Sequence, residues 1–306
     1  IVCNSGIANT CAADGVEKAE AMCRLAADAL GLAPSDMMVA STGVIGPSIP
    51  IEPIVASMPA LAASLSPHGG SDAAEAIMTT DTVKKEIAVS LTIGGKEVRL
   101  GAIAKGSGMI HPNMGTMLCG ITTDCAIDGA LLQDMLRQVV TKTFNRITVD
   151  GDTSTNDMCV VLANGMAGNS LIEWKDQDYE TFLAALEEVC RYLSRAIAGD
   201  GEGASKLVTC KMHGARSEES AERLAKAVVG SSLVKGAVFG TDANWGRVLC
   251  AIGYSGAQFD PKDVEVKFLS RAGELLVCAG GQGVAFDEAL AKRVLSEDEV
   301  VIQVTL

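Results

Sequence analysis

The chain has 306 residues, of which 48% are hydrophobic and 21% charged, so we expect a folded globular protein and not a disordered one. Its formal net charge of −13 repels phosphate backbones, which disfavours a nucleic-acid partner. The sequence contains no run of eighteen apolar residues, and therefore no membrane-spanning helix is expected.

The ten cysteines include no C-x-x-C pair, and most of them lie in apolar runs such as 248–252. This pattern predicts buried free thiols in a reducing compartment, and hence a cytoplasmic protein. Cysteine and histidine are not clustered at the spacing that zinc ligands need, so no zinc site is expected. The chain starts at Ile1 without a methionine and ends in the strand-like segment 300–306, and both ends are expected to be cut from a longer product.

Helix and strand signals alternate in the first third of the chain. Asp14 and Glu17 form a possible capping box for a helix that runs to Ala29 and is ended by Gly31. A short buried strand is expected over 37–40. Two longer strands, 84–93 and 96–104, flank Gly94-Gly95 and predict a hairpin.

The same alternation continues to the C-terminus, with apolar residues at helical spacing in the longest segment, 177–198. Further strands are expected over 117–122, 146–149, 158–162, 207–211, 264–268 and 275–279, and further helices over 128–140, 218–229, 244–252 and 286–295. The fold class is therefore α/β or α+β, and the hairpin argues against a purely parallel sheet.

Several common kinds of active site find little support. The three histidines, His68, His111 and His213, lie beside no G-x-S-x-G or H-E-x-x-H motif, so nothing indicates a Ser-His-Asp triad. The glycine-rich loops 105–108 and 199–206 lack the full dinucleotide and P-loop patterns, and are more typical of turns.

The segment 105–118, KGSGMIHPNMGTML, is the strongest chemical signal. A threonine becomes a nucleophile when a base lies beside it, and its own α-amine can serve once the preceding bond is cut. Gly115 lacks a Cβ, which leaves its carbonyl open to attack by the Thr116 hydroxyl.

This segment resembles the self-cleavage motif of the ornithine acetyltransferase family, also called bifunctional glutamate N-acetyltransferase/amino-acid acetyltransferase. Four other blocks agree with that family in order: NSGIAN at 4–9, STGVIG at 41–46, DGDTSTND at 150–157 and FGTDANWGR at 239–247. The resemblance spans essentially the whole chain. One departure is Gly115, where the family usually has alanine before the cleaved threonine.

The resemblance implies an α-β-β-α sandwich that cuts itself into an α part, 1–115, and a β part, 116–306, which stay together as an α2β2 assembly. It implies acetyl transfer from N-acetylornithine to glutamate with release of ornithine, in arginine biosynthesis. Whether acetyl-CoA also serves as a donor stays open.

The resemblance also implies roles for individual residues. Thr116 matches the nucleophile, the bond between Gly115 and Thr116 the cleavage site, and Thr42 with Gly43 the oxyanion hole. The positions that match substrate-binding residues are Thr79, Lys105, Thr116 and Glu202. From the residues alone, the segment 152–157 is better explained as a structural turn cluster than as a metal site.

Three alternatives stay open. The same nucleophile could serve an amidase or aminopeptidase that uses water as the acceptor, or a relative that acetylates intermediates of secondary metabolism. A non-catalytic binding module is the third, although the Gly115-Thr116 step argues against it.

Overall fold

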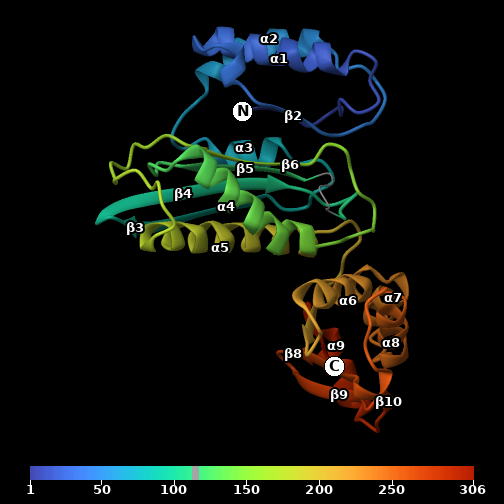
Figure 1. The fold of residues 1–306 in the computed structure, drawn as a ribbon. Helices are drawn as coiled ribbons and strands as arrows, with labels where there is room; N and C mark the ends of the chain where they lie inside the picture. The colour runs from blue at the N-terminus through green and yellow to red at the C-terminus, as the bar shows by residue number, and fades with distance from the viewer. Residues whose placement is uncertain (112–116) are drawn as a thin grey trace. The chain divides into compact units, whose positions relative to one another are not determined.

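The structure is a computed structural model that describes residues 1–111 and 117–306, and it divides into two compact units. The first unit comprises residues 1–145 and 152–202, and the second comprises 146–151 and 203–306. Figure 1 shows the elements of both units. The expected division into 1–115 and 116–306 concerns processing at a bond that lies outside the described residues, and it stays a prediction.

A four-stranded mixed sheet forms the centre of the first unit. Its strands are β3 (Lys85–Ile93), β4 (Lys96–Lys105), β5 (Leu118–Thr123) and β6 (Met158–Ala163), in that spatial order. The β3–β4 and β4–β5 pairs are antiparallel, whereas β5 and β6 are parallel. Gly94 and Gly95 connect β3 to β4 with φ values of 54° and 77°, the left-handed conformation of a two-residue hairpin turn. The expected hairpin is confirmed.

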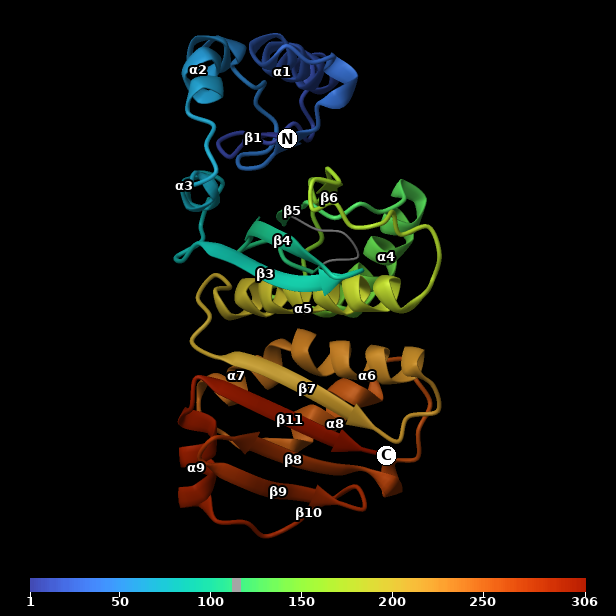
Figure 2. The same ribbon diagram turned by 90° about the vertical axis from the view of Figure 1, so that its left-hand side faces the viewer.

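Helices cover this sheet. The long helix α5 (Gln177–Gly199) packs against β3 and β4, and α4 (Gly129–Lys142) packs against α5 (Figure 2). Asp176 caps α5 by accepting a hydrogen bond from the Tyr179 amide at 3.0 Å. Alternate residues of β4, from Val98 to Ala104, are buried, as expected for one face of a strand covered by a helix. The short helix α3 (Gly70–Ala76) precedes β3.

The N-terminal part of the first unit consists of two helices and a two-stranded parallel sheet. The strands are β1 (Val2–Asn4) and β2 (Val39–Ser41), and the helices are α1 (Gly15–Leu30) and α2 (Ile51–Ala63), with a short 3-10 turn, η1 (Pro34–Asp36), after α1. A small core of Val2, Met22, Ala26 and Met58 joins them. The loops that follow β1 and β2 carry the sequence blocks 4–9 and 41–46.

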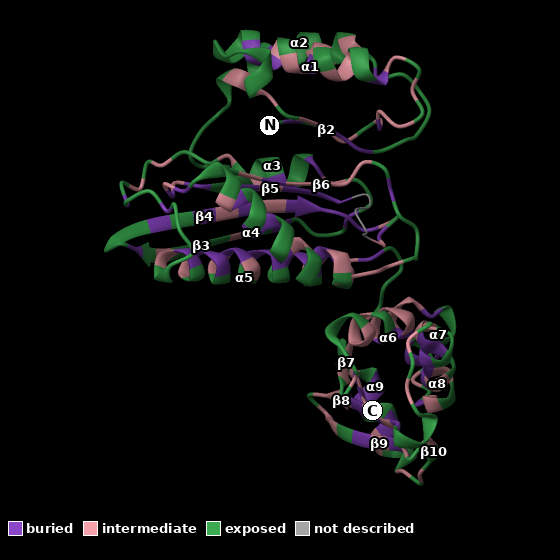
Figure 3. Cartoon of the chain, in the orientation of Figure 1, coloured by how far each residue is buried: buried purple, intermediate pink, exposed green. Residues whose placement is uncertain are grey.

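The second unit is built on a five-stranded sheet with the order β10-β9-β8-β11-β7. Its strands are β7 (Leu207–His213), β8 (Glu265–Ser270), β9 (Gly273–Ala279), β10 (Gln282–Gly283) and β11 (Glu299–Thr305). The helices are α6 (Glu218–Gly230), α7 (Ser232–Phe239), α8 (Trp245–Gly253) and α9 (Glu288–Ser296), and a 3-10 turn, η3 (Pro261–Asp263), precedes β8. Alternate residues Val300, Ile302 and Val304 of β11 are buried in one apolar core with side chains of α6, α8 and α9. Figure 3 shows the chain coloured by how far each residue is buried.

Three local expectations are wrong. Asp14 precedes α1 but makes no capping hydrogen bond, because its carboxylate accepts one from the Ser48 hydroxyl at 2.6 Å. Residues 146–149 form no strand but follow a 3-10 turn, η2 (Phe144–Arg146), and the Val149 carbonyl accepts its hydrogen bond from the Lys235 side chain at 2.5 Å. Cys250 is exposed, because α8 turns the neighbouring Val248 and Ala251 towards the core.

The other cysteines follow the expectation in part. All ten are free thiols, and Cys119, Cys125, Cys190 and Cys278 are buried, but Cys3 and Cys11 are exposed along with Cys250. Within the described ranges, no helix is long and apolar enough to cross a membrane. The mixed composition of helix and strand confirms the expected α/β class.

Candidate active site

The register of the first unit's sheet brings the expected site to one end of it. Lys105, the last residue of β4, pairs with Leu118, the first residue of β5, and Leu118 in turn pairs with Met158, the first residue of β6. The expected cleavage site and nucleophile, Gly115 and Thr116, lie outside the described residues. Met117, which directly follows them in sequence, is described and buried.

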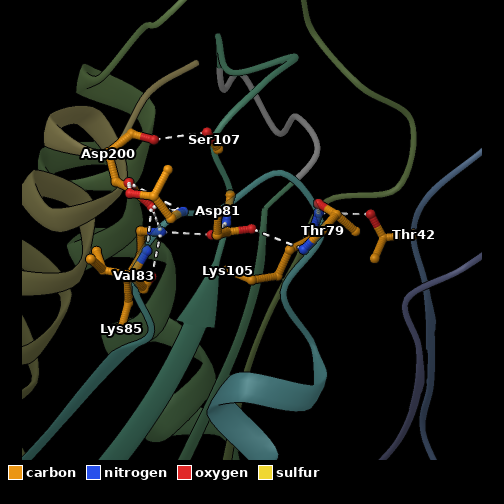
Figure 4. A network of polar contacts seen from close by, with 10 residues as sticks. Thr42, Thr79, Asp81, Val83, Lys85, Lys105, Ser107 and Asp200 are labelled. Atoms are coloured by element: carbon orange, nitrogen blue, oxygen red, sulfur yellow. Dashed lines mark hydrogen bonds and ion pairs between the residues drawn. The ribbon is translucent and has the colours of Figure 1, made fainter. Parts of the chain in front are cut away.

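Lys105 joins two of the expected site residues. Its ammonium group donates a hydrogen bond to the Thr42 hydroxyl at 2.7 Å and approaches the Thr79 hydroxyl at 3.4 Å (Figure 4). Only 2% of Lys105 is exposed, and this burial lowers the pKa of its side chain, while the nearby Asp81 and Asp157 carboxylates act to raise it. Lys105 is therefore a buried cation held at the end of the sheet, and not a solvated surface lysine.

The turn at Thr42 and Gly43 is held by the loop that follows β1. The Thr42 amide donates to the Asn4 carbonyl at 2.9 Å, and the Val44 amide donates to the Gly6 carbonyl at 3.2 Å. Between them, Gly43 has a φ of 118°, and a Cβ at this position would lie 2.3 Å from the Gly6 oxygen. Only glycine fits there.

This geometry leaves two potential donors. Among the described residues, none accepts a hydrogen bond from the Gly43 amide. The Thr42 hydroxyl accepts its bond from Lys105, so its own hydrogen stays available for donation. The expected oxyanion-hole pair thus offers an N–H and an O–H from adjacent residues.

A buried ion cluster supports this end of the sheet. The Lys85 ammonium lies 2.6 Å from a carboxylate oxygen of Asp81 and 2.6 Å from one of Asp200, and 8% or less of each of these side chains is exposed (Figure 4). Burial alone would raise the pKa of Asp81, but hydrogen bonds from the Gly106 amide and Lys85 hold it below its ordinary value. For Asp200, Lys85 and Thr82 likewise outweigh burial and lower the pKa.

The cluster positions expected site residues on both of its sides. Asp81 accepts hydrogen bonds from the Thr79 amide at 3.2 Å and from the Gly106 amide, next to Lys105, at 2.7 Å. Asp200, at the C-terminal end of α5, accepts the Ser107 hydroxyl through its backbone carbonyl at 2.7 Å. Through Asp81 and Asp200, buried Lys85 therefore connects the segment that carries Thr79, the segment that follows Lys105 and the C-terminal end of α5.

Glu202 lies two residues after Asp200 and contacts the glycine-rich segment that follows Lys105. Its amide donates to the Ser107 carbonyl at 3.1 Å, and its carboxyl group covers Gly108, where a Cβ would lie 2.5 Å from the Glu202 Cδ atom. The side chain is exposed. The structure thus places Thr42, Gly43, Thr79, Lys105 and Glu202 along one continuous set of contacts.

Sequence reasoning missed Asp157, which it assigned to a structural turn. Asp157 directly precedes β6, and its Oδ1 accepts a hydrogen bond from the Met117 amide at 2.5 Å. Burial raises the pKa of this carboxyl to about 7, against the opposing effects of the Met117 amide and Lys105. The signal in the sequence was the block 150–157, which resembles the family but had no role assigned to it.

Within residues 1–111 and 117–306, no group of three or more His, Cys, Asp or Glu side chains could hold a metal ion.

Comparison with known proteins identifies the family. The ArgJ family matches residues 1–306. The chain belongs to the ArgJ family. It is 55% identical to the arginine biosynthesis bifunctional protein ArgJ of Symbiobacterium thermophilum, over 100% of this chain and 75% of that protein. It is 48% identical to the protein of the same name from Caldanaerobacter subterraneus subsp. tengcongensis, over 100% of this chain and 76% of that protein.

A solved structure agrees with this assignment. The crystal structure of the arginine biosynthesis bifunctional protein ArgJ from Bacillus halodurans superimposes with a TM-score of 0.56 at 42% identity, covering 60% of this chain and 85% of that one. The resemblance stated from the sequence is confirmed. This ArgJ-family protein is an acyltransferase of arginine biosynthesis, and its mixed fold is consistent with the expected N-terminal-nucleophile-like type.

We expect Lys85→Met to lower the free energy of unfolding by about 3–5 kcal/mol, because two buried carboxylates would lose their cation. Lys175→Met is the matched control, since Lys175 pairs with Asp134 at 2.8 Å on the surface, where both side chains are more than half exposed. The control should cost less than about 1 kcal/mol. Equal losses in chemical denaturation would contradict the structural role of Lys85.

We expect Asp157→Asn to change how stability depends on pH. The pKa of Asp157 is about 7 in the folded protein, above the unfolded value of about 3.9. The folded state therefore retains a proton that the unfolded state loses, and this stabilisation disappears as the pH rises through the folded pKa. Between about pH 5 and pH 7, the free energy of unfolding of the variant should rise relative to that of the wild type by up to about 1.4 kcal/mol per pH unit. Parallel pH curves would contradict the raised pKa.

Proposed function

We propose that this enzyme moves an acetyl group from N-acetylornithine to glutamate through an acetyl ester on Thr116, and releases ornithine. The observation that supports this most is the hydrogen bond from buried Lys105 to the Thr42 hydroxyl, beside the Gly43 amide, which has no acceptor among the described residues. This arrangement lies at the end of the sheet where β5 begins, two residues after Thr116 in sequence.

The first stage is self-cleavage. The Thr116 hydroxyl attacks the Gly115 carbonyl carbon, a tetrahedral oxyanion forms, and its collapse breaks the C–N bond and leaves an ester on the threonine oxygen. Water then hydrolyses the ester, which frees the Gly115 carboxylate, the Thr116 hydroxyl and the Thr116 α-amine. Free α-amines titrate at about 7.7–8.0, so this amine can serve as the base of the next stage.

The second stage reuses the same hydroxyl. It attacks the acetyl carbonyl of N-acetylornithine and releases ornithine, and the acetyl ester then passes its acetyl group to the amine of glutamate. Each step forms an oxyanion, which the Thr42 hydroxyl and the Gly43 amide stabilise, each donor contributing about 3 kcal/mol. This covalent route requires neither a metal nor a cofactor.

The remaining expected residues bind the amino-acid parts of the substrates. Lys105 supplies a positive charge for a substrate carboxylate, with the Thr79 hydroxyl beside it. The Glu202 carboxyl group lies against Gly108 in the glycine-rich segment. Glu202 is exposed, and its carboxylate suits the ammonium groups of ornithine and glutamate. Separation of a cation and an anion along one site matches substrates that carry both charges.

The α and β parts remain together in this proposal, as the family resemblance implies, and two copies of each form an α2β2 enzyme in the cytoplasm. Six residue pairs between β4 and β5 support this, because they join the two sides of the cut by backbone hydrogen bonding.

We expect Thr116→Ala to give a single uncut chain without acetyl transfer, because both stages need the hydroxyl. Thr116→Ser retains a hydroxyl and should retain part of each activity. Intact mass under denaturing conditions reports the cut, and release of ornithine from N-acetylornithine with and without glutamate separates transfer from hydrolysis. Normal transfer by uncut Thr116→Ala protein would refute the proposed route. Repeated turnover of N-acetylornithine without glutamate would favour an amidase, because the proposed route releases only one ornithine per site when the acceptor is absent.

We expect Lys105→Met to lower kcat/KM for both substrates. The loss should correspond to about 1.5–3 kcal/mol of transition-state stabilisation, the usual value of a hydrogen bond to a charged group. The KM should rise because a substrate carboxylate loses its cation. The kcat should fall as well, because the Thr42 hydroxyl loses the donor that orients it. Unchanged kcat and KM in steady-state assays would place Lys105 outside the site.

A further inference from the structure

Two consecutive residues, Asn156 and Asp157, contact the two halves of the proposed catalytic apparatus. Asp157 accepts the Met117 amide at 2.5 Å, and this amide belongs to the peptide bond that joins Met117 to Thr116. Asn156 donates from Nδ2 to the Ser41 carbonyl at 2.9 Å, and this carbonyl belongs to the peptide bond that joins Ser41 to Thr42. One residue therefore holds the peptide next to the nucleophile, and the other holds the peptide next to the oxyanion hole.

The orientation of the Asn156 amide group is determined by its other partners. The Ser41 carbonyl can only accept, so the nitrogen must face it, and Oδ1 then accepts hydrogen bonds from the Thr10 and Thr155 hydroxyls. The same nitrogen also donates to the Asn9 side-chain oxygen at 2.7 Å. An aspartate of the same shape would lack both donors.

Asp157 is held by the strand that follows it. Met158 pairs with Leu118 in the parallel β5–β6 ladder, and the Met158 amide donates to the Met117 carbonyl at 2.9 Å. Met117 is therefore bonded on both sides, through its carbonyl to Met158 and through its amide to Asp157. The backbone of the residue after Thr116 has little freedom to rotate.

The second carboxyl oxygen of Asp157 lowers the stability of the folded protein. Oδ2 is buried and has no hydrogen-bond partner among the described residues. A buried acceptor without a partner costs about 1–3 kcal/mol, so a carboxyl group at this position is unfavourable for stability alone. Residues that reduce stability in this way are concentrated at functional sites.

We propose that Asn156 and Asp157 form a positioning pair that sets the nucleophile against the oxyanion hole, both in self-cleavage and in acetyl transfer. The two neighbouring side chains reach two different segments, the residue before β5 and the last residue of β2. The pair acts through its hydrogen bonds to the Met117 amide and the Ser41 carbonyl, two backbone groups that neighbour the nucleophile and the oxyanion hole in sequence. This inference rests on the proposed function of Thr116, Thr42 and Gly43.

The two residues have opposite hydrogen-bonding roles, and exchanging their side chains tests them. Asp157→Asn keeps an acceptor for the Met117 amide and should retain kcat within about threefold, whereas Asp157→Ala removes it. Asn156→Asp keeps the shape but removes both donors, and should behave like Asn156→Ala. The damaging variants should lower kcat about 10–100-fold with little change in KM, because misplacement of a reacting group by about 1 Å has an effect of this size.

The matched control is Asp128→Ala. Asp128 also accepts backbone amides, those of Ala130 and Leu131 at 3.0 Å each, but it caps α4 away from the end of the sheet that carries the site. It should lower thermal stability and leave kcat unchanged. Transfer is measured per cleaved chain, with the cleaved fraction taken from denaturing mass spectrometry, and the rate of cleavage is followed separately.

Slower cleavage and lower kcat in Asp157→Ala and Asn156→Asp, with kcat retained in Asp157→Asn, would support the positioning pair. The inference is overturned if the damaging variants keep normal kcat, change only KM, or lose no more kcat than Asp128→Ala. These outcomes are distinct from failure of the proposed function, which would appear as normal transfer by Thr116→Ala.

Discussion

The arrangement of the site depends on a lysine that never reaches solvent. Lys85 lies between Asp81 and Asp200, and each partner then uses its remaining groups to hold another segment. Asp81 holds the amides of Thr79 and Gly106, and Asp200 holds the Ser107 hydroxyl. A buried ion pair of this kind contributes little net stability, because desolvation offsets most of the attraction. Its main effect is geometric, since each charge must stay paired and the attached segments must therefore stay in place.

The site also shows how the register of a sheet brings distant residues together. The C-terminal end of β4 and the N-terminal ends of β5 and β6 meet at one end of the sheet, so residues near 105, 117 and 157 become neighbours through strand register alone. The turn at Thr42 then joins them through hydrogen bonds from Lys105 to the Thr42 hydroxyl and from Asn156 to the Ser41 carbonyl. Rigid strands define these positions more tightly than loops could, which suits chemistry that depends on small distances.

Local sequence patterns predicted the regular elements well. The hairpin around Gly94 and Gly95 and the long helix α5 are specified by turn chemistry and by helical spacing, which are local properties. The helix α2 was not expected, because Pro53 and Pro59 interrupt its pattern, although Pro59 lies inside the helix. Cys250 was misplaced because an apolar run does not show which side of a helix faces the core.

The candidate site was predictable only where a family motif carried it. Thr42, Thr79 and Lys105 were proposed from resemblance, and their contact arises from strand register, which no local pattern contains. Asp157 and Asn156 lay inside a recognised block, yet composition and spacing could not separate a turn residue from one that holds the backbone of another segment. Long-range hydrogen bonds of this kind become visible only when the fold is known.

The pairing of β4 with β5 has a consequence for the order of events during maturation. While the chain is intact, the six residue pairs between these strands form within one molecule, and closing the connection between them costs an entropy that grows only slowly with its length. After a cut between the strands, the same pairs would have to form between two molecules, at the added cost of lost translational freedom. A cut protein that unfolds could then recover only at a rate set by the concentration of its two pieces. Such a protein must fold first and be cut second, and its persistence afterwards is governed by how slowly it opens.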